Sequence, residues 1–179
     1  MINCYSFVMS KVVIHTGTTG TVKSSTSKVL SGTLPGTWAL ISQDDIRELV
    51  KAGYKSAAEE WTDDTKNQWE VSIDICCDMI KRYHQYDINC ILEMFAPPSE
   101  FEKWKPKLNG IDYQLFVLRP YLETTLERHR GRKGKMTEEQ IRENHEWFTS
   151  WQPDQATIID PSNQTLEETV AFISQSISK

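Results

Sequence analysis

The sequence predicts a three-layer α/β fold, in which helices cover both faces of a parallel sheet of about five strands. Short runs rich in β-branched residues alternate along the chain with segments whose apolar residues recur at helical spacing. The apolar runs are continuous, which is typical of strands buried on both faces of a parallel sheet. The chain has 179 residues, enough for one full hydrophobic core but few for two. We therefore expect a single domain over 1–179.

Each element is predicted from its local pattern. The first strand is predicted at 11–15, because Lys11-Val-Val-Ile-His15 is β-branched and runs into a Thr-Gly turn signal. The other predicted strands are 38–41, 88–92, 113–118 and 157–159. Helices are predicted around 28–30 with a stop at Gly32, from Ile46, over 63–84, over 121–130, after the capping-box signature at Thr137 and from Thr165. Pro97-Pro98 is expected to break the chain.

Charge and composition restrict the class of function. The net charge is −5, which argues against a protein that binds nucleic acid over its whole surface. Nine Lys or Arg against three acids in 103–135 give that segment +6, so the rest of the chain carries −11. A basic segment on an acidic body predicts one local anion site that would suit phosphates.

Localisation is predicted from what the sequence lacks. No apolar run reaches the roughly 20 residues that a membrane helix needs, and 1–9 has neither a basic start nor a small-residue cleavage site. The four cysteines lack metal-binding spacing and are expected to be free thiols in a reducing cytosol. We expect a cytoplasmic protein without a membrane partner. Residues 1–10 are expected to be an optional lead-in, since a second Met stands at position 9.

A phosphate-binding loop is predicted between the first strand and the helix that follows it. Gly17-Thr18-Thr19-Gly20-Thr21-Val22-Lys23-Ser24 matches the Walker A pattern G-x-x-x-x-G-K-[ST] at every fixed position except one. In such loops the backbone N–H groups surround the phosphates, the Lys reaches the β- and γ-oxygens, and the Ser holds Mg²⁺. The predicted nucleotide-binding residues are therefore Gly17, Thr18, Thr19, Gly20, Thr21, Val22, Lys23, Ser24 and Ser25, with Ser24 as the metal ligand.

The exception is Val22, which stands where the pattern has its second fixed Gly. A β-branched side chain is stiff and bulky at a position where the backbone approaches the phosphates. A negative φ at Val22 would mainly crowd the phosphates, whereas a positive φ would be expected to reshape the loop. The sequence leaves both open, and it leaves open whether the substitution reduces turnover.

The segment 11–47 resembles a group of P-loop phosphotransferases that includes zeta toxins, chloramphenicol phosphotransferases and the kinase domain of phage polynucleotide kinase. The resemblance extends from the phosphate loop to Asp44-Asp45-Ile46-Arg47, which follows the second strand as the group's D-D-x-R motif does. It implies a P-loop kinase-like fold with strand order 2-3-1-4-5. It also implies that Asp44 is the general base for the acceptor hydroxyl and that Arg47 binds the acceptor. The alternative is that Asp44 or Asp45 only caps a helix that starts at Ile46.

Further residues follow from the same resemblance. Glu93 ends the third strand, where an acid would contact the acceptor or help to hold Mg²⁺; a solvated strand-end acid is the alternative. A lid over about 128–138 would carry arginines that neutralise charge on the transferred group. Arg128 and Arg132 are the favoured catalytic members, Lys23 acts with them, and Arg130 is expected to bind substrate. The alternative is that these basic residues only suit the end of a helix.

The combined prediction is an ATP- and Mg²⁺-dependent kinase of a hydroxyl acceptor. The acceptor would be a small molecule, a nucleotide or a polynucleotide 5′-OH. The acidic body favours a small molecule, while the basic segment keeps nucleic acid open. Two other classes are considered: a catalytically inactive P-loop binding or regulatory module, and a nucleotide hydrolase or switch. The hydrolase is disfavoured because no water-positioning element is found.

Overall fold

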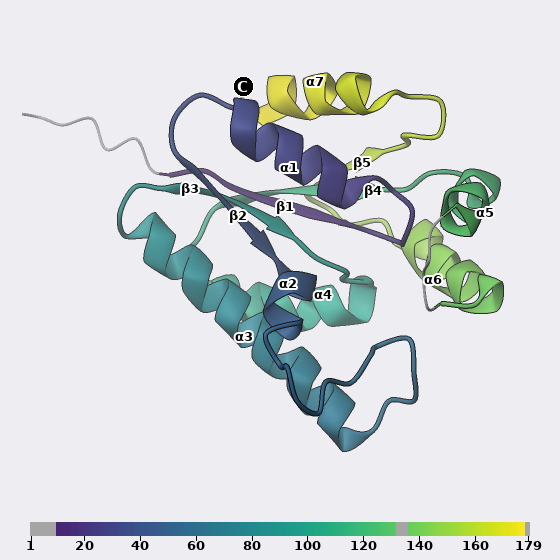
Figure 1. The fold of residues 1–179 in the computed structure, drawn as a ribbon. Helices are drawn as coiled ribbons and strands as arrows, with labels where there is room; N and C mark the ends of the chain where they lie inside the picture. Colours follow the sequence, from purple (N-terminus) through teal and green to yellow (C-terminus); the bar gives the residue numbers. More distant parts are fainter. Residues whose placement is uncertain (1–9, 132–135, 178–179) are drawn as a thin grey trace, which may run out of the picture.

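A five-stranded parallel sheet forms the centre of the computed structural model, which describes residues 10–131 and 136–177 (Figure 1). The sheet order is β2-β3-β1-β4-β5, and every pairing is parallel. Both the fold class and the strand order predicted from the sequence are confirmed. The strands are β1 (Val12–Gly17), β2 (Trp38–Ser42), β3 (Asn89–Glu93), β4 (Tyr113–Leu118) and β5 (Ala156–Ile159).

Helices connect the strands in the alternation that the sequence predicts. The helix predicted over 63–84 is observed with the same bounds, and the capping box at Thr137 is present. The first helix continues through Gly32, so the predicted stop there is wrong. The elements are α1 (Lys23–Thr33), α2 (Gln43–Arg47), α3 (Asp63–His84), α4 (Pro98–Trp104), the 3₁₀ helix η1 (Lys105–Leu108), α5 (Leu122–Arg130), α6 (Glu138–Ser150) and α7 (Leu166–Ile177).

Helix α4 was not predicted, because Pro97-Pro98 was expected to break the chain. Pro98 is instead the first residue of this helix. Proline suits that position, since its fixed φ is helical and its missing N–H would have no partner in the first turn. Behind it, Phe101 and Trp104 are buried in the core, so packing holds a helix that local signals would not predict.

Two apolar clusters cover the two faces of the sheet. On one face, β-strand side chains pack with Leu30 of α1 and with Ile173 and Ile177 of α7. On the other face, they pack mainly with α3 and with the α4–η1 segment, and Phe148 of α6 joins this cluster. Figure 1 shows α1 and α7 together on one side and α3 with α4 on the opposite side. Helices therefore cover both faces of the sheet, as continuous apolar strands require.

The strand register brings the predicted site residues to one edge of the sheet. His15 of β1 and Ser42 of β2 both lie opposite Glu93, the last residue of β3. The phosphate loop therefore starts beside the end of β3, and α2 begins immediately after the end of β2. In open parallel sheets, this carboxyl edge is where ligands bind.

Three of the four cysteines lie in the described part of the chain. Cys76, Cys77 and Cys90 are buried free thiols, as expected, and burial raises the pKa of Cys76 and Cys90 to about 12. Cys4 lies outside the described residues. Along 10–131 and 136–177, no helix combines the length and the apolarity that crossing a membrane would require.

Candidate active site

The loop between β1 and α1 has a backbone that depends on glycine at its first position. Gly17 has φ 146°, and a Cβ atom there would lie 2.2 Å from the carbonyl oxygen of Leu118 on the neighbouring strand. Gly20 also has a positive φ, of 73°. Any side chain at Gly17 would collide with a backbone atom of β4, so the close approach of the loop to the sheet requires this glycine.

Val22 takes the left-handed conformation, with φ 60° and ψ 17°, and helix α1 begins directly after it. The φ left open by the sequence is therefore positive. Left-handed backbone is strained for a β-branched residue. The Val22 side chain is half-buried and packs against the apolar cluster between the sheet and helices α1 and α7. Its apolar atoms thus gain contacts within the core, which offset part of the backbone strain.

The Lys23 ammonium group lies against the loop itself. Its Nζ donates to the carbonyl oxygens of Gly17 and Thr18, at 2.7 Å each. The hydroxyl of Thr21 donates to the same Thr18 oxygen at 3.0 Å. The hydroxyl oxygen of Thr18 is buried without a hydrogen-bond partner. The loop therefore concentrates a positive charge and an unsatisfied buried hydroxyl at the start of α1.

Ser24 and Glu93 meet across the carboxyl edge of the sheet. The Ser24 hydroxyl donates to Glu93 Oε1 at 2.5 Å, although the two residues are 69 positions apart in the sequence. Mg²⁺ prefers oxygen ligands and is usually held by one or two protein groups together with phosphates and water. A hydroxyl and a carboxylate in contact beside a phosphate loop fit that ion. Groups of three or more His, Cys, Asp or Glu that could hold a metal are absent from the described part of the chain.

His15 lies beneath the phosphate loop as a neutral side chain. It lies inside β1, which continues to Gly17, and does not end the strand. Its Nδ1 shares a 2.7 Å hydrogen bond with the Ser27 hydroxyl of α1, while its Nε2 is buried without a partner. Complete burial, followed by the nearby charge of Lys23, lowers the pKa of His15 to about 3. The imidazole is therefore uncharged at neutral pH.

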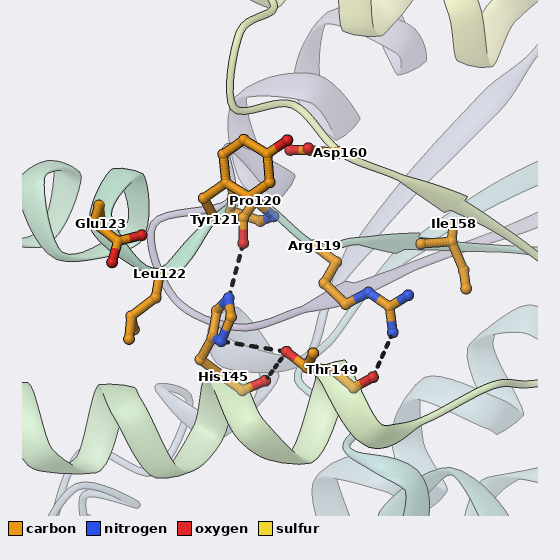
Figure 2. Close-up of a pocket in the computed structure, with 9 residues that line it drawn as sticks. All are labelled: Arg119, Pro120, Tyr121, Leu122, Glu123, His145, Thr149, Ile158 and Asp160. Atoms are coloured by element: carbon orange, nitrogen blue, oxygen red, sulfur yellow. Dashed lines mark hydrogen bonds between the residues drawn. The ribbon is translucent and has the colours of Figure 1, made fainter.

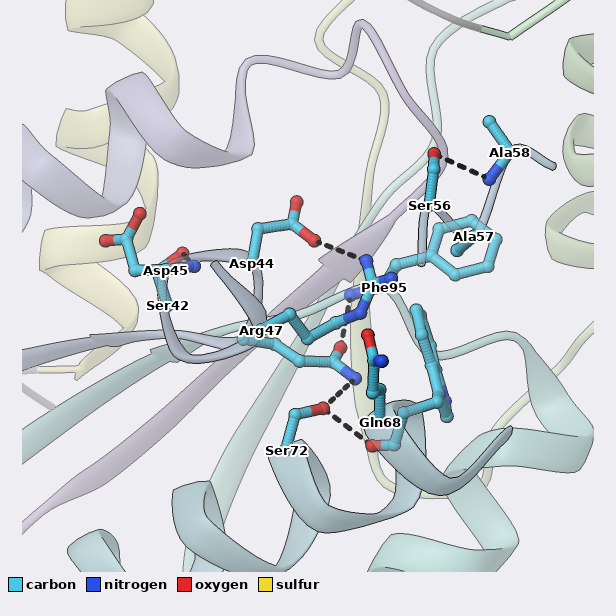
Figure 3. Close-up of polar contacts among 12 residues, drawn as sticks. Ser42, Asp44, Asp45, Arg47, Ser56, Ala57, Ala58, Gln68, Ser72 and Phe95 are labelled. Atoms are coloured by element: carbon cyan, nitrogen blue, oxygen red, sulfur yellow. Dashed lines mark hydrogen bonds and ion pairs between the residues drawn. The ribbon is translucent and has the colours of Figure 1, made fainter. Parts of the chain in front are cut away.

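Asp44 projects from α2 at the same sheet edge and faces Arg47. Helix α2 starts at Gln43 rather than at Ile46, and Ser42 is its N-cap through a hydrogen bond from the Asp45 N–H. Neither aspartate is the capping residue. The Asp44 side chain is 75% exposed, and its Oδ1 lies 3.6 Å from Arg47 Nη1. Figure 3 shows the Asp44 carboxylate directed at the guanidinium and the Asp45 carboxylate directed away from it.

Arg47 is almost completely buried, with 4% of its side chain exposed. Its Nη2 donates to the carbonyl oxygen of Lys55 at 2.9 Å, and its Nε is buried without a partner. The guanidinium carbon lies 5.4 Å from the ring centre of Tyr54 and 5.0 Å from that of Trp69, which is cation–π geometry. These contacts direct the donors of Arg47 toward Asp44 and the protein interior. The prediction that Arg47 binds the acceptor stays a prediction.

Two residues that the sequence analysis missed hold this edge together. Gln43 is buried. Its Oε1 accepts from the Phe95 N–H at 3.3 Å, and its Nε2 donates to the Ser72 hydroxyl at 3.4 Å. The Thr16 hydroxyl accepts from the Ala96 N–H and is within hydrogen-bonding distance of the Ala96 carbonyl oxygen. Gln43 of α2 and Thr16 of β1 both bind the segment that follows β3, and a single sequence carries no spacing signal for such contacts.

The predicted arginines separate into different environments. Arg128 Nη2 donates to the carbonyl oxygen of Pro161 at 3.0 Å, and its Nη1 lies 3.5 Å from that of Gly20, so it contacts the phosphate loop. Arg130 pairs with Glu138 at 2.7 Å, which holds the pKa of the Glu138 carboxyl below its usual value. Arg132 lies outside the described residues, as does part of the predicted lid.

Basic residues in the described part of the segment 103–135 have several different partners within the protein. Lys103 pairs with Glu100, and Lys107 pairs with Asp74. The Nη1 of Arg119 donates to three backbone carbonyl oxygens around the end of α6. These three charges have partners close by, whereas Arg128 of the same segment contacts the phosphate loop at Gly20, so the single anion site expected from the charge pattern stays a prediction.

A surface pocket lies between the start of α5, helix α6 and the end of β5 (Figure 2). His145 Nε2 lies 2.9 Å from the Pro120 carbonyl oxygen, and Thr149 contacts the same imidazole. Asp160, on another wall, accepts from the N–H of Ser162. The His145, Thr149 and Asp160 side chains thus have partners within the protein. None of the residues that line this pocket belongs to the Asp44–Arg47 segment.

Comparison with known proteins supports the fold. The chain matches no protein-family model and no curated protein. It is similar to the solved structure of a tunicamycin resistance protein from Deinococcus radiodurans, with a TM-score of 0.72 at 16% identity, covering 94% of this chain and 95% of that one. It is also similar to an unliganded sugar kinase from Janibacter sp. HTCC2649, with a TM-score of 0.67 at 14% identity, covering 94% and 96%.

A gluconokinase from Sinorhizobium meliloti 1021 is similar to the same extent, with a TM-score of 0.66 at 17% identity, covering 95% of this chain and 93% of that one. At these identities the similarity defines the fold alone. The chain therefore has the fold of P-loop kinases over its whole described length. The narrower resemblance to zeta toxins, chloramphenicol phosphotransferases and polynucleotide kinase is not confirmed by these structures.

Proposed function

We propose that this chain is an ATP- and Mg²⁺-dependent phosphotransferase that moves the γ-phosphoryl group to a hydroxyl of a small-molecule acceptor. The observation that carries the proposal is the contact between Ser24 and Glu93 beside the Lys23 loop. It joins a predicted metal ligand to a strand-end acid at the sheet edge from which Asp44 also projects. Solved structures of the same fold include proteins described as a sugar kinase and a gluconokinase, and these descriptions support the proposal that this chain is a kinase.

The proposed roles follow from position and charge. The loop N–H groups and the Lys23 ammonium would bind the β- and γ-phosphates, and Ser24 with Glu93 would hold Mg²⁺, directly or through water. When bound, Mg²⁺ neutralises charge on the phosphate oxygens. Arg128, which contacts the loop at Gly20, is placed to add positive charge on the nucleotide side. Arg130 and Arg132 keep their predicted substrate and catalytic roles as part of this proposal.

Asp44 is the proposed general base. Its exposed carboxylate would accept the proton of the acceptor hydroxyl while the hydroxyl oxygen forms a bond to the γ-phosphorus. The bond between that phosphorus and the oxygen bridging to the β-phosphate breaks, and ADP leaves. Arg47, whose Nη1 lies 3.6 Å from Asp44 Oδ1, would hold the Asp44 carboxylate in its orientation.

The acceptor is proposed to be a sugar or a sugar acid, by analogy with the neighbours described as a sugar kinase and a gluconokinase. A nucleotide is the alternative small acceptor. A polynucleotide end is less favoured, because the body of the protein is acidic and because Lys103, Lys107 and Arg119 of the basic segment have partners within the protein. If a polynucleotide is the acceptor, binding should weaken steeply with added salt.

A second candidate function is a P-loop binding or regulatory module without turnover. The strained backbone of Val22 is the observation that favours it, since a loop under strain at the phosphates can lose catalytic geometry. The two candidates differ in whether phosphate is transferred, not in whether nucleotide binds.

The test is transfer of labelled γ-phosphate from ATP to a panel of sugars, sugar acids and nucleotides, using the native chain and Asp44→Asn. We expect transfer to at least one acceptor class, a loss of 100-fold or more in kcat for Asp44→Asn, and similar ATP binding in both proteins. Unchanged kcat would overturn the base assignment. Nucleotide binding without transfer to any acceptor would favour the binding module.

A further inference from the structure

The side-chain amide of Gln140 makes two hydrogen bonds, one at the start of helix α6 and one to a distant loop. Its Oε1 accepts from the backbone N–H of Thr137 at 2.9 Å, which completes the capping box of α6. Its Nε2 donates to the carbonyl oxygen of Ala58 at 3.1 Å, 82 positions away in the sequence. The first bond is local and stabilises the helix end. The second joins α6 to the loop between α2 and α3 and is not needed for the cap.

The loop that Gln140 reaches, residues 48–62, leads back to the proposed acceptor side. The Ala58 N–H donates to the Ser56 hydroxyl, and the two are drawn together in Figure 3. One residue earlier, the carbonyl oxygen of Lys55 accepts from Arg47, which in turn faces Asp44 at 3.6 Å. A short series of polar contacts thus runs from Gln140 through the loop to the candidate base.

Helix α6 is connected at its other side to the nucleotide-binding part of the molecule. Glu138, two residues before Gln140, pairs with Arg130 at the end of α5. His129 Nε2 lies 3.0 Å from the carbonyl oxygen of Met136. Arg128, which is on α5 with His129 and Arg130, contacts the phosphate loop at Gly20. The start of α6 therefore lies between contacts to the phosphate loop and contacts to the loop 48–62.

We propose that Gln140 is a positioning residue: its Nε2 hydrogen bond to Ala58 fixes the loop 48–62 against α6 and so holds Arg47 and Asp44 in place for the acceptor. The positioning of the loop is independent of the proposed function, whereas its consequence for the acceptor rests on it. Nothing in the local sequence marks the second bond, because the capping box alone accounts for a glutamine at this position.

The variant Gln140→Glu removes the hydrogen bond to Ala58 and keeps the capping bond to Thr137. A glutamate keeps the oxygen that accepts from Thr137, and glutamate serves a capping box as well as glutamine does. It has no N–H for Ala58, and its charge would face a carbonyl oxygen. Thr137→Val is the matched control, since it removes the hydroxyl that accepts from the Gln140 N–H and leaves the Gln140 side chain unchanged.

The measurement is hydrogen–deuterium exchange of the full chain at neutral pH, followed on peptides from 48–62 and 138–150. The amides of Lys55, Ala58 and Glu59 are the reporters, because each donates to a partner within the loop or on α3. In Gln140→Glu we expect exchange over 48–62 to rise about two- to tenfold, the effect of one net hydrogen bond, with 138–150 unchanged. In Thr137→Val we expect the larger rise at the start of 138–150.

Unchanged exchange over 48–62 in Gln140→Glu, or a rise spread equally over both segments, would overturn the positioning role. With an acceptor found, Gln140→Glu should raise the acceptor KM several-fold and leave the KM for ATP unaltered; the reverse pattern would count against the link to Asp44. Absence of transfer in the native chain, combined with the expected exchange pattern, would reject the phosphotransferase proposal and leave the loop contact established.

Discussion

Replacing Val22 by glycine and, separately, by alanine tests whether the phosphate loop stores strain at this residue. Val22 has φ 60°, and its side chain packs against the cluster beneath α1 and α7. Two effects of similar size therefore oppose each other in Val22→Gly. Removing the side chain relieves the strain but also removes its packing.

The magnitudes can be worked out from the structure. Left-handed backbone costs an L-residue about 1–2 kcal/mol, which glycine does not incur. A half-buried valine contributes about 1 kcal/mol of packing, roughly half of a fully buried one. Glycine adds about 0.5–1 kcal/mol of entropy to the unfolded chain. We expect the free energy of unfolding of Val22→Gly to lie within about 1 kcal/mol of that of the native chain. Val22→Ala keeps the strain but loses most of the packing, so it should be less stable by about 1 kcal/mol.

Urea unfolding of the three proteins, followed by circular dichroism with a common denaturant slope, measures this ranking. Valine and glycine should be similar, and alanine should be the least stable. If alanine is more stable than glycine, as at an ordinary helical position, then φ at position 22 is not positive and our account of the loop is wrong.

Two further perturbations test the site. The lowered pKa of His15, about 3, means that the folded protein resists protonation of a group that titrates near 6.5 when unfolded. The free energy of unfolding should therefore fall as the pH drops below about 6.5, and His15 alone should lower it by about 2 kcal/mol at pH 5. Urea unfolding of His15→Gln should lack that part of the pH dependence. The same pH dependence in both proteins would contradict a neutral, buried His15. Arg47→Met keeps much of the side-chain volume but loses the bonds to Asp44 and Lys55; we expect it to lower kcat by tenfold or more while ATP affinity measured by calorimetry changes little. A change confined to ATP affinity would count against a role for Arg47 on the acceptor side.

Much of the fold could be predicted because its signals are local. Strands such as Tyr113–Leu118 are continuous apolar runs, and the Asp63–His84 helix has regular apolar spacing and a Thr62 cap. The strand order came from the resemblance of the phosphate loop and the D-D-x-R segment to P-loop kinases, and the structure confirmed it. The same resemblance placed Ser24 and Glu93 near one metal, and the structure brings them into contact.

The remaining features depend on contacts between residues far apart in sequence. Helix α4 forms because Phe101 and Trp104 are buried, which the Pro-Pro signal before them conceals. The burial of Arg47 depends on Tyr54 and Trp69, whose positions are fixed only when the loop folds against α3. The D-D-x-R motif predicts that Arg47 is available to bind a ligand. In the structure its side chain is buried and its donors face other parts of the protein.

The most direct test of the central claim is titration calorimetry of Mg·ATP with the native chain, Val22→Gly and Lys23→Met. Our account predicts that the native chain binds, that Val22→Gly binds with a Kd within about tenfold, a difference below 1.4 kcal/mol, and that Lys23→Met binds far more weakly. If only Val22→Gly binds, then Val22 disables the loop, contrary to the packing seen in the structure. If neither of the first two binds, the loop is not a nucleotide site and the phosphotransferase proposal fails.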